Sequence, residues 1–321
     1  GAVHAQRELG AEIVLVGQRA AIETCLRNEQ AELEIIDASE VITMDDDPST
    51  ATRRKKDASM TVALNLLRDG KGDAVVSAGS TGALLTGATL IVKRIHGIRR
   101  AALAPVLPNG DAGVMLIDCG ATADCTPEFL LQFAFMGSYY AEKVLGIENP
   151  RVALLNIGAE DSKGGELQKA VYPLLKQAGE AGAINFTGNI EARDVPLGGA
   201  DVVVADGFSG NILLKGIEGT ALFMASMMKD MFKKNVLTKL AALLCMDGVK
   251  AFKKKMDYRE TGGTALIGLS KPVIKAHGSS DALAIRNAIR QAIGAVEADV
   301  AATLAANMDH MVIPKEYQHA E

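Results

Sequence analysis

The sequence has no tryptophan, few aromatic residues (4%) and only four cysteines among 321 residues. The cysteines form no CxxC pair and have no histidine at ligand spacing; they are Cys25, Cys119, Cys125 and Cys245. This spacing excludes the common zinc motifs and does not suggest a disulfide framework. We expect reduced thiols in a cytoplasmic protein, with no metal.

The chain also lacks long apolar runs and an excess of positive charge. No run approaches the ~18 apolar residues that cross a bilayer, and the first residues lack the basic-then-apolar profile of a signal peptide. The net charge is −5, so the chain has no overall attraction to the phosphates of nucleic acid. We expect a soluble protein that binds no nucleic acid, which still allows contact with a membrane surface.

Short apolar segments alternate with amphipathic ones, which predicts an α/β fold with a mostly parallel sheet. The segments VALLNIG and DVVVADG each contain four consecutive apolar residues, which indicates strands buried on both faces. Without an internal repeat or a low-complexity linker, we expect one compact unit over residues 1–321. The expected strands are 11–17, 33–38, 73–79, 101–108, 113–120, 151–158 and 200–207; the expected helices include 19–28, 55–70, 127–145 and 165–179.

Four glycine-rich turns follow expected strands, at 77–82, 156–165, 206–211 and 277–280. Helix N-termini carry unpaired N–H groups and partial positive charge, so turns of this kind suit phosphate. Ordinary capping and turn chemistry is the alternative for each turn alone. GxGxxG and GxxxxGK[ST] are absent, which excludes the common nucleotide motifs. The candidate phosphate or substrate residues are Ser77, Gly79, Ser80, Thr81, Gly82, Asn156, Gly158, Gly207, Ser209, Lys215, Gly278 and Ser279.

Charged and polar side chains near these turns are candidates for catalysis. Lys163 and Lys215 can balance phosphate charge, and His277 and Asn211 can serve a developing oxyanion or thiolate. Asp206, like Asp118, ends an apolar strand; it orients a cation or substrate, or only stabilises its turn. Further cations lie at RRKK (53–56), which is also readable as a solvated face, and at Lys275.

The segment of about 224–256 differs from the rest of the chain because lysines flank methionines and leucines at helical spacing. Such a protruding amphipathic helix fits an anionic membrane surface or an acidic protein partner. Core packing or a dimer contact is the alternative. We expect a break at Asp247–Gly248. The candidate contact residues are Leu237, Lys239, Leu240, Leu244, Lys250 and Lys253.

The order of many motifs resembles that of the bacterial phosphate acyltransferases of phospholipid synthesis. Among these motifs are RRKKDASM, VSAGSTGALLTGA, LIDCGATADC, VVADGFSGNILLK and VIKAHGSSD. The resemblance implies a three-layer fold like the isocitrate and isopropylmalate dehydrogenases, related to phosphotransacetylase. It also implies a homodimer at the inner face of the cell membrane, without a cofactor. The implied reaction moves a long-chain acyl group from acyl carrier protein to inorganic phosphate, giving acyl phosphate.

Two departures from the family pattern concern the expected site. Family members usually begin with a strand and a motif close to DAMGGDxxP, so we expect the N-terminal strand to be missing here. Ser80 replaces the asparagine that is more usual in SAGNTGA, which keeps a polar group of shorter reach. Two other functions stay open: a dehydrogenase on the same fold, and a membrane-associated scaffold that binds acyl carrier protein without turnover.

Overall fold

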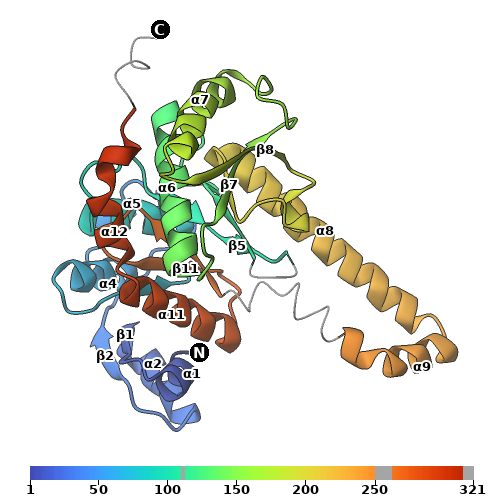
Figure 1. The fold of residues 1–321 in the computed structure, drawn as a ribbon. Coiled ribbons are helices and arrows are strands. Elements are labelled where there is room, and N and C mark those ends of the chain that lie inside the picture. The colour runs from blue at the N-terminus through green and yellow to red at the C-terminus, as the bar shows by residue number, and fades with distance from the viewer. Residues whose placement is uncertain (110–112, 250–261, 314–321) are drawn as a thin grey trace.

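The computed structural model describes residues 1–109, 113–249 and 262–313, in which strands and helices alternate (Figure 1). The helices are α1 (Ala2–Leu9), α2 (Arg19–Asn28), α3 (Ala51–Arg54), α4 (Ser59–Arg68), α5 (Thr81–Ile91), α6 (Pro127–Lys143), α7 (Glu166–Glu180), α8 (Gly207–Lys233), α9 (Val236–Leu244), α11 (Ala282–Glu297) and α12 (Val300–Ala306). The strands are β1 (Val14–Gly17), β2 (Glu34–Asp37), β3 (Val75–Ser77), β4 (Ala102–Ala104), β5 (Val106–Leu107), β6 (Val114–Ile117), β7 (Arg151–Asn156), β8 (Asn185–Glu191), β9 (Val202–Val204), β10 (Gly263–Ile267) and β11 (Val273–Ala276). The predicted alternation is confirmed.

These strands form three sheets, where the sequence predicted one. Their orders are β1-β2, β3-β11-β10-β4 and β5-β6-β9-β7-β8. Most neighbours run parallel, but β10 is antiparallel to both β11 and β4, and β5 is antiparallel to β6. Only residues 268–272 join β10 to β11, which is too short for the crossover that parallel strands need. The α/β class is therefore right, with antiparallel pairs added to it.

The two larger sheets are joined by the segment that contains β4 and β5. Only Pro105 separates these strands, which belong to different sheets. The Cys119 N–H donates to the Leu103 carbonyl at 3.0 Å, and the Leu116 N–H donates to the Pro105 carbonyl at 3.0 Å. The end of β6 is thus fixed against β4, and the two sheets share one backbone connection.

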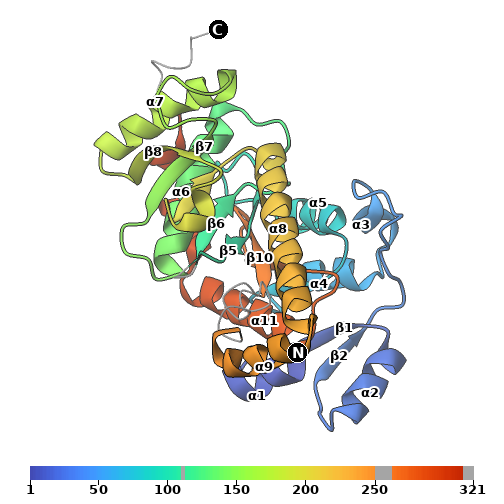
Figure 2. The same ribbon diagram turned by 90° about the vertical axis from the view of Figure 1, so that its right-hand side faces the viewer.

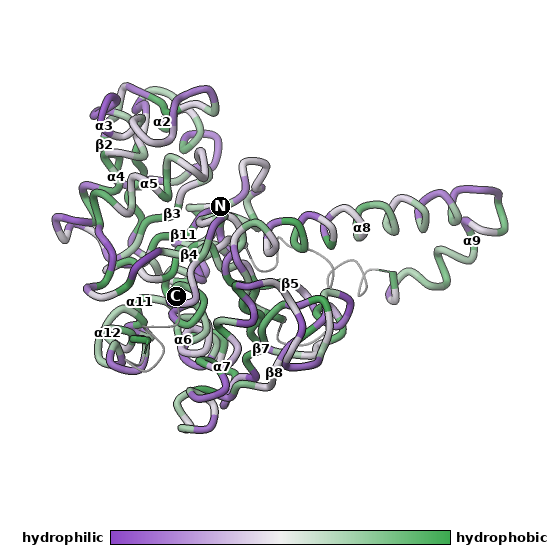
Figure 3. The backbone as a smooth tube through the Cα atoms, turned by 90° about the horizontal axis from the view of Figure 1, so that it is seen from above, coloured by the Kyte–Doolittle hydropathy of each residue, from purple (hydrophilic) through white to green (hydrophobic). Residues whose placement is uncertain are grey.

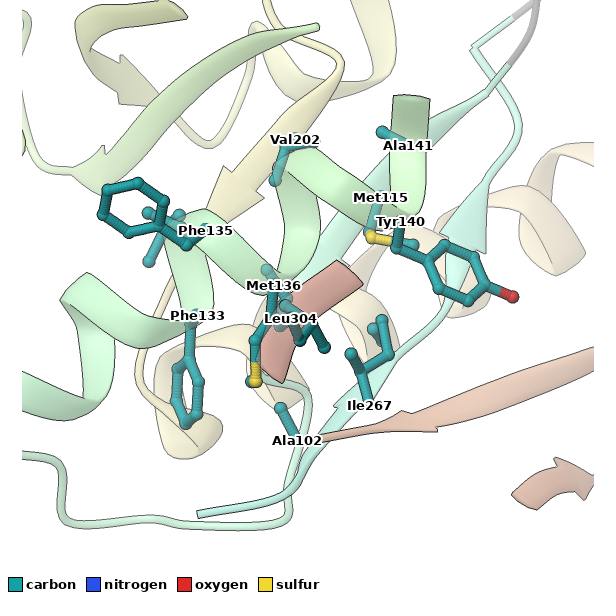
Figure 4. Packing of buried hydrophobic residues seen from close by; sticks show 14 of the residues in the cluster. Ala102, Met115, Phe133, Phe135, Met136, Tyr140, Ala141, Val202, Ile267 and Leu304 are labelled. Carbon is teal, nitrogen blue, oxygen red and sulfur yellow. The ribbon is translucent and has the colours of Figure 1, made fainter. Parts of the chain in front are cut away.

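Hydrophobic clusters lie on both faces of the five-stranded sheet. Met115 and Ile117 of β6 belong to a cluster with α6, α7 and α11, whereas Val114 and Leu116 belong to a second cluster with α4 and α5. Figure 4 shows the first cluster, to which Phe133 and Met136 of α6 and Ile267 of β10 belong. The predicted burial of these strands on both faces is confirmed, and it gives helix, sheet and helix layers.

The outer part of α8 projects from the body and carries α9 near its far end (Figures 1 and 2). We call residues 219–244 the arm. Large apolar side chains of the arm are exposed, among them Leu222 (72%), Phe223 (64%), Leu237 (76%) and Leu244 (83%). Figure 3 shows α9 as a largely hydrophobic segment away from the body. Core packing within one chain, one of the sequence alternatives, is therefore wrong for the arm.

The predicted break of the amphipathic segment at Asp247–Gly248 is wrong. α8 ends at Lys233 and α9 begins after Asn235. α9 in turn ends at Leu244, with a turn at Cys245, and residues 246–249 are helical. Asn235 Oδ1 accepts the Thr238 N–H at 2.9 Å, and Thr238 Oγ1 accepts the Asn235 N–H at 3.0 Å. This reciprocal capping begins a new helix. Within the described ranges, no helix has the length and apolarity to cross a membrane.

Candidate active site

Two of the four predicted turns leave the same edge of the four-stranded sheet. β3 and β11 run parallel, and Lys275 lies opposite Ser77 in their register. The carboxyl ends of parallel neighbours meet at one edge, where ligands of open α/β sheets bind. The turns 77–82 and 277–280 therefore lie side by side.

The turn after β3 presents hydroxyl groups at the beginning of α5. Ser77 Oγ accepts the Gly79 N–H at 3.2 Å. Ser80 is the N-cap residue of α5, but its side chain makes no capping hydrogen bond, although it is 92% buried (8% exposed). Thr81 is exposed at the first helical position, and Gly82 follows it. The sequence also allowed Ser80 to act only as a helix cap, and the structure contradicts that alternative.

The turn after β11 is organised around His277. Its Nδ1 accepts the Ser279 N–H at 3.2 Å and lies 2.7 Å from the Ser279 hydroxyl oxygen. Because Nδ1 accepts a hydrogen bond, the neutral imidazole carries its proton on Nε2. Gly278 and the imidazole are exposed. His277 is thus oriented by its own turn.

The other two predicted turns share an edge of the five-stranded sheet. β7 and β9 run parallel, with Leu154 opposite Val204. The turn 156–165 leaves β7 and the turn 206–211 leaves β9. The structure therefore arranges the four turns as two pairs on two sheets.

Asn156 shapes the loop after β7. Its Nδ2 donates to the Lys163 carbonyl at 3.1 Å and to Asn189 Oδ1 at 3.0 Å, and its Oδ1 accepts the Ile157 N–H. Asn189 comes from β8, 33 residues away, and no local sequence signal indicated it. The Lys163 side chain is half-exposed, with Nζ 4.0 Å from a Glu160 carboxylate oxygen, and Gly158 lies beside both. Lys163 is therefore at the surface of this loop.

The turn after β9 begins α8. Asp206 is buried and caps the helix, since its Oδ1 accepts the Ser209 N–H at 2.8 Å. Asn211 is exposed in the first turns of the helix. Lys215 lies one turn further and pairs with Glu218 at 2.7 Å. Asp206 thus has the turn-stabilising role that the sequence left open, and Asn211 is the more accessible polar group.

Asp118 is fully buried and organises the loop after β6. Its Oδ1 accepts three backbone N–H groups, and its Oδ2 accepts the Thr122 N–H at 2.7 Å. Burial raises the pKa of Asp118, and these backbone hydrogen bonds oppose the shift. Asp118 therefore stabilises a turn, the second role considered for it.

The helices that follow the two pairs of turns contact the same hydrophobic cluster. Leu84 of α5 is buried in it, and Leu213 and Ile217 of α8 pack against it. This shared packing connects the N-terminal parts of α5 and α8. Both helix N-termini follow a strand end, where partial positive charge favours an anion.

The basic run RRKK is divided between two roles. Lys55 Nζ donates to Asp46 Oδ2 at 2.7 Å and to the Val41 carbonyl at 2.9 Å, so it braces the preceding loop. The hydrogen bond from Lys55 holds the pKa of Asp46 down to about 2. The other three basic residues of the run are exposed. The solvated-face interpretation thus holds for them but not for Lys55.

Two other features of the described residues bear on ligand binding. A cavity of about 410 Å³ lies among Gln6, Glu12, Ile13, Glu32, Leu33 and Glu34. Its three carboxylates oppose binding of a phosphate anion. No group of three or more His, Cys, Asp or Glu side chains in the described ranges is placed to hold a metal ion. For the arm, Leu237, Lys239, Leu240 and Leu244 are exposed, whereas Lys250 and Lys253 lie outside the described residues.

Solved structures share this fold at low sequence identity. A phosphotransacetylase from Streptococcus pyogenes matches with a TM-score of 0.56 and 21% identity, covering 93% of this chain and 89% of that chain. The 4-hydroxythreonine-4-phosphate dehydrogenase from Klebsiella pneumoniae matches with a TM-score of 0.50 and 14% identity, covering 94% and 90%. These matches confirm the predicted fold, which phosphotransacetylases and a dehydrogenase share.

Sequence comparison gives a closer relationship. A protein named phosphate acyltransferase from Thermoanaerobacterium thermosaccharolyticum is 49% identical over 300 residues, which cover 94% of this chain and 89% of that protein. The family model described as "Fatty acid synthesis protein" matches residues 1–303. The chain belongs to this family of fatty acid synthesis proteins.

Proposed function

We propose that the protein transfers a long-chain acyl group from the thioester of acyl carrier protein to inorganic phosphate. The products are acyl phosphate and the carrier with its thiol restored. The observation that carries the proposal is the 49% identity, over 94% of this chain, to a protein named phosphate acyltransferase. The two pairs of glycine-rich turns support it, because they leave strand ends and lead into helix N-termini or a polar turn.

The proposed chemistry needs alignment more than strong acid catalysis. A phosphate oxygen attacks the thioester carbonyl carbon, and the tetrahedral intermediate carries its negative charge on the former carbonyl oxygen. The C–S bond then breaks, the carbonyl re-forms, and the thiolate leaves. Thiols ionise near neutral pH, so the leaving group needs little protonation. Positioning and oxyanion donors then provide the main rate acceleration.

We assign the roles by exposure and position. His277 and Asn211 are exposed next to the ends of β11 and β9, so they are suited to donate to the oxyanion or to the departing thiolate. The surface position of Lys163 suits attraction of phosphate into the site. Asp206 stabilises the N-terminus of α8, because its carboxylate accepts the Ser209 N–H. This geometry makes Asp206 a positioning residue in the proposal.

The reaction is expected to give a new phosphorus NMR resonance. The protein is mixed with palmitoyl acyl carrier protein and phosphate, and the release of carrier thiol is followed in parallel. Acyl phosphate and thiol should appear together, and thiol release should require phosphate. Carrier binding without either product would favour the scaffold alternative, and a dinucleotide difference spectrum would favour the dehydrogenase.

For the arm, we propose contact with an anionic membrane surface and with a second copy of the chain. Exposed apolar side chains of α9 suit the membrane, with Lys239 beside them for anionic headgroups. Exposed apolar side chains of outer α8, such as Leu222 and Phe223, suit a matching helix of a second copy. The protein would then act as a peripheral membrane homodimer, near the site where an acyl product is used.

Replacing Leu240 and Leu244 with Glu should weaken vesicle binding at least ~tenfold, because two apolar anchors are lost and two negative charges meet anionic lipid. Flotation with phosphatidylglycerol vesicles measures this. The control variant carries Val41→Glu and Leu197→Glu, two equally charged changes at exposed positions outside the arm. If the arm variant floats like the control, α9 does not contact the membrane.

A further inference from the structure

Lys275 is a buried cation without an anionic partner in the described part of the chain. It lies on β11 and is only 8% exposed. Its Nζ donates to the Ala276 carbonyl, and no described carboxylate forms an ion pair with it. Buried lysines are almost always paired, since an isolated charge away from water is costly.

The surroundings of Lys275 disfavour its charge. Burial lowers the pKa of Lys275, and no carboxylate within the described ranges raises it again. A position like this is stabilised when an anion enters and pairs with the ammonium group. The ammonium keeps two further N–H groups beyond the one that reaches Ala276.

The register of the sheet defines the face on which Lys275 lies. Side chains two residues apart along a strand share a face, so Lys275 shares one with Val273, and Ser77 shares one with Val75. Val273 is buried in the cluster formed with α4 and α5, and Val75 packs against that cluster. Ile274, by contrast, belongs to the cluster with α11 on the other face. Lys275 and Ser77 therefore lie on the α5 face.

This face also carries the beginning of α5. The helix starts at Thr81, four residues after Ser77, and its unpaired N–H groups add partial positive charge. Ser77 Oγ accepts the Gly79 N–H, which leaves its hydroxyl proton for an anion. The Ser80 hydroxyl is not used for capping. A buried ammonium, a helix N-terminus and two hydroxyls thus come from adjoining segments.

We propose that Lys275 is the buried cation of the phosphate site and binds inorganic phosphate together with the N-terminal turn of α5 and the hydroxyls of Ser77 and Ser80. This assignment rests on the proposed function and adds a residue to it. A phosphate oxygen would take the place of the carboxylate partner that the described residues do not provide. Lys275 would hold the nucleophile in the site while the acyl donor approaches.

Thermal unfolding in the presence of phosphate tests the site without requiring turnover. Sodium phosphate should raise the melting temperature of the wild-type protein relative to sodium chloride of equal ionic strength, because a ligand that binds only the folded state stabilises it. Lys275→Met should abolish this increase while folding at least as well without phosphate, since an uncompensated buried charge is gone. Lys71→Met, at an exposed position before β3, should keep the increase.

Two outcomes would overturn the assignment: a phosphate response in Lys275→Met equal to that of wild type, or no response in wild type. If Lys275→Met does not fold, Ser80→Ala provides the test. It removes a hydroxyl that does not cap α5, and it should weaken phosphate binding several-fold at unchanged stability. An unchanged phosphate response in Ser80→Ala would then count against the site.

Kinetics separate this inference from the proposed function. Lys275→Met should raise the KM for phosphate at least ~tenfold, equivalent to the loss of one charge-assisted contact, with little change in the KM for the acyl donor. An effect confined to the KM for the acyl donor would overturn the assignment and place Lys275 in the acyl-donor site instead. If phosphate raises the melting temperature but no turnover is seen, the phosphate site is supported and the proposed reaction is contradicted.

Discussion

Gly210→Ala is expected to lower the free energy of unfolding by about 3 kcal/mol or more, among the largest effects of a single methyl group. A Cβ at Gly210 would lie 1.9 Å from the Asp118 carbonyl oxygen and 3.1 Å from its carbonyl carbon. Both are backbone atoms, so no side-chain rotation relieves the clash, and α8 must move away from β6. Urea unfolding followed by circular dichroism measures the loss.

Gly216→Ala is the matched control on the same helix. A Cβ there meets no atom within 4 Å, and alanine in a helix interior is favoured over glycine by ~0.5–1 kcal/mol. We therefore expect Gly216→Ala to match or exceed wild-type stability. Equal stability of the two variants would contradict the close approach of α8 to β6, and with it the structural reason for this glycine in DGFSGN.

The periodicity of the sequence was sufficient to predict most of the helices and strands. RAAIETCLRN forms α2 over the expected residues, and the apolar runs around Val152 and Val203 are buried on both faces. The division into three sheets was not predictable in this way, because strand pairing joins residues far apart in the chain. The helix start at Asn235, in contrast, could have been predicted from the pattern Asn-x-x-Thr. We instead expected the break in the amphipathic segment at Asp247–Gly248.

The site was predicted in outline, as four polar turns at strand ends. Which turns are neighbours depends on strand order: β3 meets β11 across almost 200 residues of chain, and β7 meets β9. The role of each polar group depended on partners that local sequence does not reveal. Asp206 and Asp118 bind backbone N–H groups, whereas Ser80 does not cap its helix. The burial of Lys275 was not predictable either, because lysine is usually exposed and nothing in the local sequence marks this one as buried.

Asp118→Ala is expected to cost about 3–5 kcal/mol of stability, because it leaves several buried backbone donors without an acceptor. The carboxylate accepts N–H groups from Leu103 at 2.8 Å, Cys119 at 2.7 Å and Thr122 at 2.7 Å, and that of Ala121 at 3.2 Å. Leu103 belongs to β4, so the loss also loosens the connection between the two larger sheets. Urea unfolding provides the measurement.

Asp118→Asn and Asp124→Ala give the comparison that isolates the acceptor role. The amide of Asn keeps one oxygen for three of the donors and sets an NH2 group against the fourth, so we expect roughly half the loss. Asp124 is exposed on the same loop, and its replacement should change stability by less than ~0.5 kcal/mol. A similar small change in Asp118→Ala would contradict the acceptor role.

The same loop links Asp118 to the candidate site. The Thr122 carbonyl accepts the Gly207 N–H at 2.9 Å, so the carboxylate that holds Thr122 also holds the first residue of α8. If the Asp118→Asn variant remains folded, the N-terminus of α8 should therefore move and turnover should fall. The rise in melting temperature with phosphate, which we assign to Lys275 and α5, should stay near that of wild type. Loss of that response in Asp118→Asn would mean that phosphate also depends on the α8 turn.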